Sequence, residues 1–99
     1  MRLRLNEQEI IDGICVFISN KVRSNPEAVD VKEISVLTNG DFVAKAVCNS
    51  QNFSLDSEDV LEGIFQFLEE YHSFNRPVMH GHIEFTKGEG FWAEVIVNE

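Results

Sequence analysis

The sequence predicts an α+β fold in which two helices pack on one face of an antiparallel sheet, with a repeated αββ unit and pseudo-two-fold symmetry. Two observations lead to this prediction. A segment that begins at Leu5 returns with the same chemical pattern at Leu55, and each copy carries apolar residues at helical spacing. Each copy is then followed by two strand-like runs joined by a glycine-containing turn, which is typical of a β-hairpin.

Length and composition restrict the class of protein. The chain has 99 residues, enough for one domain with one core, which we divide into repeats at about 1–50 and 51–99. Hydrophobic residues make up 43% and charged residues 25% of the chain, as in globular proteins. The net charge of −9 disfavours nucleic acids and anionic membranes as partners, because both attract basic patches.

The length of the apolar segments gives an expectation for the cellular location of the protein. No apolar run approaches the roughly 20 residues that span a bilayer, and the basic N-terminus has no signal-peptide core. We therefore expect a cytoplasmic protein with reduced cysteines. Cys15 and Cys48 stand among apolar residues without Cys-x-x-Cys spacing, so both are expected in the core.

The two helices are expected over residues 6–22 and 56–73. Asn6 and Asp56 each precede an acidic residue by three positions, which is the pattern of a capping box. Both helices contain a glycine at the matching position, Gly13 and Gly63, where glycine costs roughly 1 kcal/mol relative to alanine. We therefore expect the helices to cross there with their backbones in close contact.

The hairpins are expected over 31–49 and 80–98, and each is preceded by a proline, Pro26 and Pro77. Short runs at 3–5 and 53–55 also match each other. If they form strands, the unit becomes βαββ and the sheet has six strands.

We predict the register of each hairpin by asking which loop makes one face of the hairpin apolar. Three-residue loops at 39–41 and 88–90 place Phe42 opposite Thr38 and make one face of each hairpin apolar. Those faces consist of Phe42, Ala44, Ala46 and Cys48 with Ile34 and Val36, and of Phe91, Ala93, Val95 and Val97 with Ile83 and Phe85.

The opposite sheet face carries more apolar side chains than a solvated face needs. Its members are Val43, Val47, Trp92 and Ile96. β-Branched residues favour strands whichever way they point, but an apolar patch that includes tryptophan is typical of a contact surface. We therefore predict that this face binds a protein partner or a second copy of the chain as a homodimer.

A second candidate site is a histidine and glutamate cluster on the second hairpin. His80, His82 and Glu84 project from one strand face, with Glu94 expected opposite Glu84. These ligand types suit zinc or a similar ion, and His72 would be a further ligand if it reached the cluster. The alternative is a set of polar residues on a solvated strand.

Motifs of known enzymes are lacking. The chain has no glycine-rich phosphate loop, no Gly-x-Ser-x-Gly and no His-Glu-x-x-His. We therefore expect a non-enzymatic protein without a cofactor. Three functions remain: an interaction module, a metal or small-ligand binder, and an acidic inhibitor or minor enzyme with a basic partner.

Several segments together resemble a known family. They are the run from Leu3 to Ile11, Asn25-Pro26-Glu27, the strand that begins Phe42-Val43-Ala44, and Leu68-Glu69-Glu70-Tyr71. These residues look like the small YxcD-like proteins of spore-forming Gram-positive bacteria. The resemblance implies a small cytoplasmic domain of unknown function and assigns no catalytic residues.

Overall fold

The computed structural model describes residues 1–72 and 79–97, and in these residues the chain forms an α+β fold, as the sequence predicts. The elements in chain order are β1 (Arg2–Leu5), α1 (Glu7–Val22), a short 3₁₀ helix η1 (Pro26–Ala28), β2 (Val29–Val36), β3 (Phe42–Cys48), β4 (Gln51–Asp56), α2 (Ser57–His72), β5 (Met79–Thr86) and β6 (Gly90–Val97). The predicted position of Pro77 lies outside the described residues.

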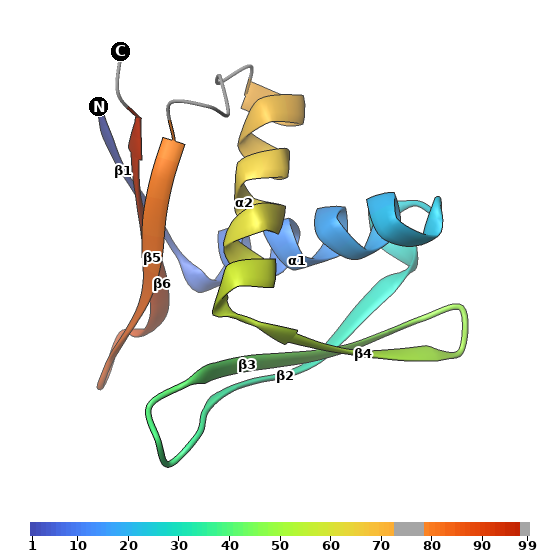
Figure 1. The fold of residues 1–99 in the computed structure, drawn as a ribbon, viewed down its shortest axis with the longest axis horizontal. Helices are drawn as coiled ribbons and strands as arrows, with labels where there is room; N and C mark the ends of the chain where they lie inside the picture. The colour runs from blue at the N-terminus through green and yellow to red at the C-terminus, as the bar shows by residue number, and fades with distance from the viewer. Residues whose placement is uncertain (73–78, 98–99) are drawn as a thin grey trace.

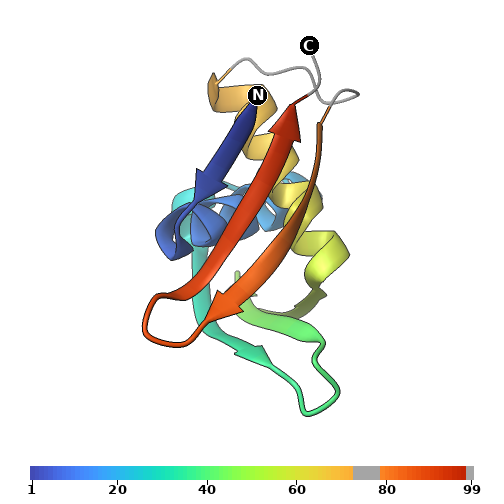
Figure 2. The same cartoon turned by 90° about the vertical axis from the view of Figure 1, so that its left-hand side faces the viewer.

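The strands form two antiparallel sheets instead of the single six-stranded sheet that we expected. Sheet A has the order β1-β6-β5 and sheet B has the order β2-β3-β4. Figure 1 shows sheet A on the left and sheet B below the helices, and Figure 2 shows sheet A face-on. The helices pack between the two sheets, so each sheet has one inner and one outer face.

Both predicted short strands form, and each completes the hairpin of the other half. β1 pairs with β6, with Leu5 opposite Ala93, while β4 pairs with β3, with Leu55 opposite Ala44. Sheet B is a continuous meander, because β4 follows β3 after only two residues, whereas sheet A is completed by β1 from the opposite end of the chain. Both halves therefore have the order β-α-β-β, whereas the duplication itself stays an interpretation of the sequence.

The helix starts are capped as predicted. The Asn6 side chain accepts a hydrogen bond from the Glu9 N–H at 2.9 Å, and the Glu9 side chain accepts from the Asn6 N–H at 3.1 Å. Asp56 and Asp59 make the same reciprocal pair, at 2.9 and 3.3 Å. These bonds satisfy N–H groups that have no partner inside the helix.

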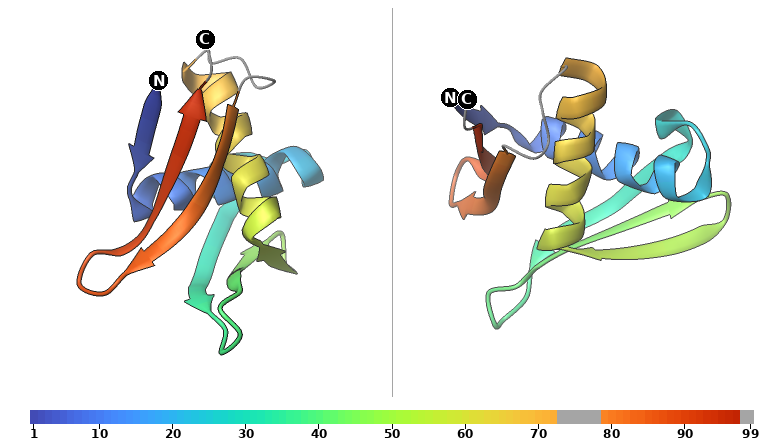
Figure 3. Two further views of the ribbon diagram at one scale, coloured as in Figure 1. Left: turned by 60° about the vertical axis from the view of Figure 1, so that its left-hand side comes forward. Right: turned by 45° about the horizontal axis from the view of Figure 1, so that its top comes forward.

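The helices cross at their glycines, which confirms the predicted close approach (Figure 1; Figure 3, right). A Cβ atom added to Gly63 would overlap the carbonyl oxygen of Gly13 and would lie 2.8 Å from the Cβ of Phe17. A Cβ atom on Gly13 would lie 2.8 Å from Cγ1 of Ile64. Nothing larger than hydrogen fits at either position, so glycine is kept despite its low helix propensity.

The hairpin loops contain three residues, but they begin one residue earlier than predicted. The first loop is 38–40, closed by a hydrogen bond from the Leu37 N–H to the Asp41 carbonyl at 2.8 Å. Gly40 has φ +91°, so glycine takes the left-handed position at the end of this loop. Phe42 therefore pairs with Val36 and not with Thr38.

The second hairpin is displaced in the same way, with Thr86 opposite Gly90 and a loop at 87–89. The strand pairing shifts by two residues in each hairpin, which leaves the side chains of the central strands β3 and β6 on their predicted faces. The inner faces of both central strands are accordingly buried, through Phe42, Ala44, Ala46 and Cys48 on β3 and Phe91, Ala93, Val95 and Val97 on β6. Only the loop-proximal members Val36 and Phe85 of the predicted apolar faces are exposed.

Both cysteines are at least partly buried, as the sequence predicts. Cys48 is buried and Cys15 is half-buried, and both are free thiols. Of the helices in the described part of the chain, neither combines the length and apolar content needed to cross a bilayer.

Replacing Gly63 by alanine tests the crossing. Helix propensity alone predicts a gain of about 1 kcal/mol in the free energy of unfolding. The added methyl group would instead collide with the Gly13 carbonyl, so we expect Gly63→Ala to lose about 2 kcal/mol or more. Urea denaturation monitored by circular dichroism measures the difference.

Glu69→Ala is the matched control, because Glu69 lies on the exposed surface of the same helix. We expect its free energy of unfolding to stay within about 0.5 kcal/mol of the wild type. A Gly63→Ala protein at least as stable as the wild type would show that the helices do not touch there.

Candidate interaction surface around Trp92

The four residues predicted to form one contact patch lie on two different sheets. Val43 and Val47 belong to β3 at the centre of sheet B, whereas Trp92 and Ile96 belong to β6 at the centre of sheet A. All four are half-buried on outer faces. The single patch is therefore not formed, because the predicted continuous sheet is divided in two.

The outer face of sheet A is the more elaborate of the two faces. Strand pairing places Arg4 opposite Glu94, His82 opposite Glu94 on the other side, and Glu84 opposite Trp92. Alternate residues of a strand share a face, so Arg2 and Ile96 also belong here. We call this set the Trp92 face; it consists of Arg2, Arg4, His80, His82, Glu84, Thr86, Trp92, Glu94 and Ile96, with Glu89 from the adjoining loop.

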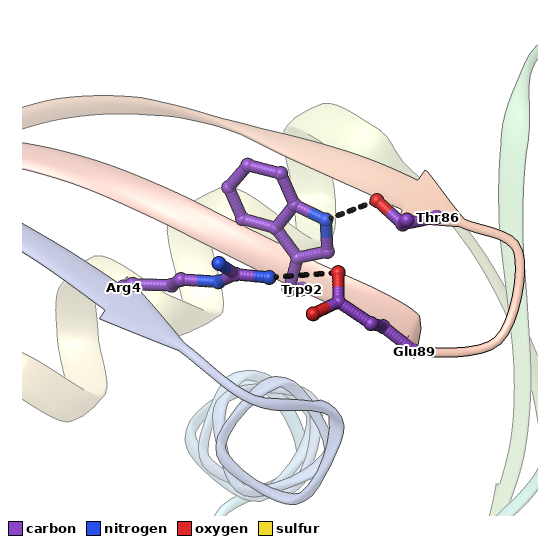
Figure 4. Close-up of polar contacts among 4 residues, drawn as sticks. All are labelled: Arg4, Thr86, Glu89 and Trp92. Atoms are coloured by element: carbon purple, nitrogen blue, oxygen red, sulfur yellow. Dashed lines mark hydrogen bonds and ion pairs between the residues drawn. The ribbon is translucent and has the colours of Figure 1, made fainter.

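The indole of Trp92 is held by contacts on both sides (Figure 4). The Arg4 guanidinium carbon lies 4.3 Å from the ring centroid, within the range of a cation–π interaction. The indole N–H donates a hydrogen bond to Oγ1 of Thr86 at 2.9 Å. Arg4 is held in turn by Glu89, at 3.2 Å, so three contacts determine where the ring lies.

Contacts between polar side chains surround this centre. Arg2 Nε lies 3.5 Å from a carboxylate oxygen of Glu94, and His82 Nε2 lies 3.4 Å from Glu84. The His82 ring centroid is 6.3 Å from that of Trp92, in an edge-on arrangement. The tryptophan is thus surrounded by charged groups of both signs, most of them about half exposed.

The predicted metal cluster is not assembled in the described part of the chain. Glu94 lies opposite His82 and pairs with Arg2, while His80 lies opposite Ile96. His72 remains on α2, with its ring centroid 5.2 Å from that of Phe67. No three histidine, cysteine, aspartate or glutamate side chains among the described residues are grouped so that they could hold a metal ion.

Several residues of the Trp92 face were missed by reasoning from the sequence. The alternation Arg2-Leu3-Arg4-Leu5 is a signal that both arginines share one strand face. The pairing of this strand with β6 was not anticipated, because it joins opposite ends of the chain. Without knowledge of that pairing, the contact between Arg4 and Trp92 cannot be predicted from the sequence.

The thiol of Cys15 lies apart from this face, on α1, and its Sγ atom is 4.0 Å from the Val29 carbonyl oxygen. Burial raises the pKa of Cys15, and the nearby carboxylates of Asp12 and Asp30 raise it further. A thiol in this environment is mostly protonated at neutral pH and is a weak nucleophile.

Comparison with known proteins places the chain in a family. Across the full length of this chain, the "Uncharacterized protein YxcD" of Bacillus subtilis (strain 168) is 52% identical over 99 residues, which cover 97% of that protein. No solved structure matches. The resemblance predicted from the sequence is confirmed.

A family described as "Protein of unknown function (DUF2653)" matches residues 1–87 of the chain, which is most of its length. The protein is therefore a member of the DUF2653 family.

Proposed function

We propose that this protein is a non-enzymatic interaction module that binds another protein through the Trp92 face. The observation that carries the proposal is the half-exposed indole of Trp92, held in place by Arg4 and Thr86. Tryptophan and arginine are the residues most enriched among those that dominate binding energy at protein interfaces. Ile96, on the same strand face, extends the apolar centre of the surface.

The fixed orientation of Trp92 favours binding. A side chain that is ordered before binding loses less conformational entropy when a partner covers it, and such losses are about 0.5–1.5 kcal/mol for a flexible side chain. The contacts to Arg4 and Thr86 restrict the indole in the free protein. A partner could therefore cover a surface that already has its final shape.

Charge favours a different protein over a second copy of this chain. Two copies would each carry a net charge of −9 and would repel one another at low ionic strength. The surrounding ion pairs, such as Arg2 with Glu94, offer both signs of charge to a partner. Such a polar rim around an apolar centre is the usual anatomy of an interface between proteins that also exist separately.

Fluorescence of the tryptophan tests whether Arg4 covers the indole. Trp92 is the only tryptophan, so its emission reports this site alone. We expect Arg4→Ala to shift the emission maximum to longer wavelength, because water replaces the guanidinium. The free energy of unfolding should fall by about 0.5–1 kcal/mol.

Arg2→Ala is the control, since Arg2 pairs with Glu94 and has the same charge but is not stacked on the ring. Its emission maximum should equal that of the wild type. Identical spectra for the Arg4 variant and the wild type would count against a cation–π contact in solution.

Replacing Trp92 by glutamate tests the interaction itself. Trp92 points away from the core, so Trp92→Glu should keep the circular dichroism spectrum while it abolishes capture of the partner from a lysate of the source organism. Leu37→Glu makes the same kind of change on an exposed residue of the other hairpin and should capture the partner as the wild type does.

Sedimentation velocity on the same three proteins separates the two kinds of partner. A monomer mass for all three, together with capture that depends on Trp92, supports a different protein as partner. Capture of the same proteins by wild type and Trp92→Glu, with unchanged masses, would rule out this face as the binding surface.

A further inference from the structure

A second feature lies away from the Trp92 face, where α1, η1 and the C-terminal part of α2 border an open cleft of about 340 Å³. The position of these elements can be followed in the right-hand view of Figure 3. This volume falls in the lower part of the range found for small-molecule sites. The ion pairs of the Trp92 face do not reach it, so its chemistry has to be considered separately.

The apolar part of the cleft comes from all of these elements and from the start of β2. Val16 and Val29 are buried and form part of its lining. Two aromatic rings from successive turns of α2 also line it: the centroids of Phe67 and Tyr71 are 5.5 Å apart, and the ring planes are tilted by 36°. Tyr71 is 57% exposed, so its ring is accessible to a ligand in the cleft.

Among the described residues that line the cleft, the charged groups all have the same sign. Asp12 of α1 and Glu27 of η1 contribute carboxylates, and the described residues that line the cleft include no lysine or arginine. Asp12 has one neutral partner, the Gln8 amide at 3.2 Å. Burial raises the pKa of the adjacent Cys15 thiol, and the carboxylates of Asp12 and Asp30 raise it further.

We propose that this cleft binds an organic cation, an ammonium group attached to an apolar body. The apolar body would cover Val16 and Val29, while the ammonium group would meet the carboxylates and the faces of the α2 rings. Aromatic faces and carboxylates are the two kinds of group that bind desolvated ammonium ions in proteins. The site goes beyond the proposed interaction surface and does not depend on it.

The overall charge of the protein supports a cationic ligand. A net charge of −9 on 99 residues raises the concentration of cations near the surface and repels anions. A neutral ligand of the same shape would gain only the apolar contacts. The cleft should therefore discriminate between ligands by charge more than by shape.

Phenethylamine and 2-phenylethanol form a matched pair of probes, because they share an aromatic body and differ in the charged group. Titration of ¹⁵N-labelled full-length protein, followed by amide chemical shifts, should show saturable changes near Cys15, Val29 and Tyr71 with phenethylamine. The affinity for 2-phenylethanol should be at least about tenfold lower, which corresponds to the loss of one good ionic contact.

Two double variants separate local from overall charge. Asp12→Asn with Glu27→Gln should weaken phenethylamine binding by about tenfold or more. Asp41→Asn with Glu69→Gln makes the same change in net charge at exposed positions outside the cleft and should change the affinity by less than about twofold. Tyr71→Ser, at an exposed position, should weaken binding without unfolding the protein.

Alkylation of Cys15 gives an independent readout, since this thiol lines the cleft. Saturating phenethylamine should slow the reaction of Cys15 with iodoacetamide, and 2-phenylethanol at the same concentration should not. Equal affinity for the two probes, equal weakening in both double variants, or shifts confined to residues outside the cleft would each overturn the proposal. Failure here would leave the tests of Trp92 unaffected.

Discussion

The contact between the two helices at Gly13 and Gly63 is the constraint on which the rest of the structure depends. Each helix connects a strand of one sheet to a strand of the other: α1 follows β1 of sheet A and leads to β2 of sheet B, and α2 runs from β4 back to β5. The relative placement of the sheets is therefore set by how closely the helices approach. With any side chain at Gly63, the helices would separate and both sheets would move with them.

The pairing of β1 with β6, an exchange between the two ends of the chain, makes the fold cooperative. The second hairpin gains its outer strand from residues 2–5, and the N-terminal ammonium group donates a hydrogen bond to the Val97 carbonyl at 2.7 Å. Contacts between such distant positions form only when the whole chain is folded. The same exchange brings Arg4 onto Trp92, so the candidate interaction surface exists only in the complete domain.

Local features could be predicted from the sequence, and long-range features could not. Asn6 and Asp56 mark helix starts because capping depends on residues three positions apart, and Gly13 and Gly63 indicate a close approach because each carries a local cost. The faces of the hairpins follow from alternation. The division into two sheets could not be predicted, because alternation does not say which hairpin a short strand joins. For the same reason, Val43 was wrongly grouped with Trp92. Glu94 lies opposite His82 and not Glu84, because the register of the second hairpin differs by two residues from the predicted one.

The central claim is that the crossing of the helices joins the two sheets into one unit, so that the Trp92 face and the cleft beside α1 are parts of one rigid scaffold. Native-state hydrogen exchange in increasing urea tests this claim most directly, through the central-strand amides of Ala44 in β3 and Val95 in β6. We predict that the slowest amides of both strands exchange with the same free energy, equal to that of global unfolding. A sheet whose slowest amides exchange several kcal/mol more easily than those of the other would contradict the account.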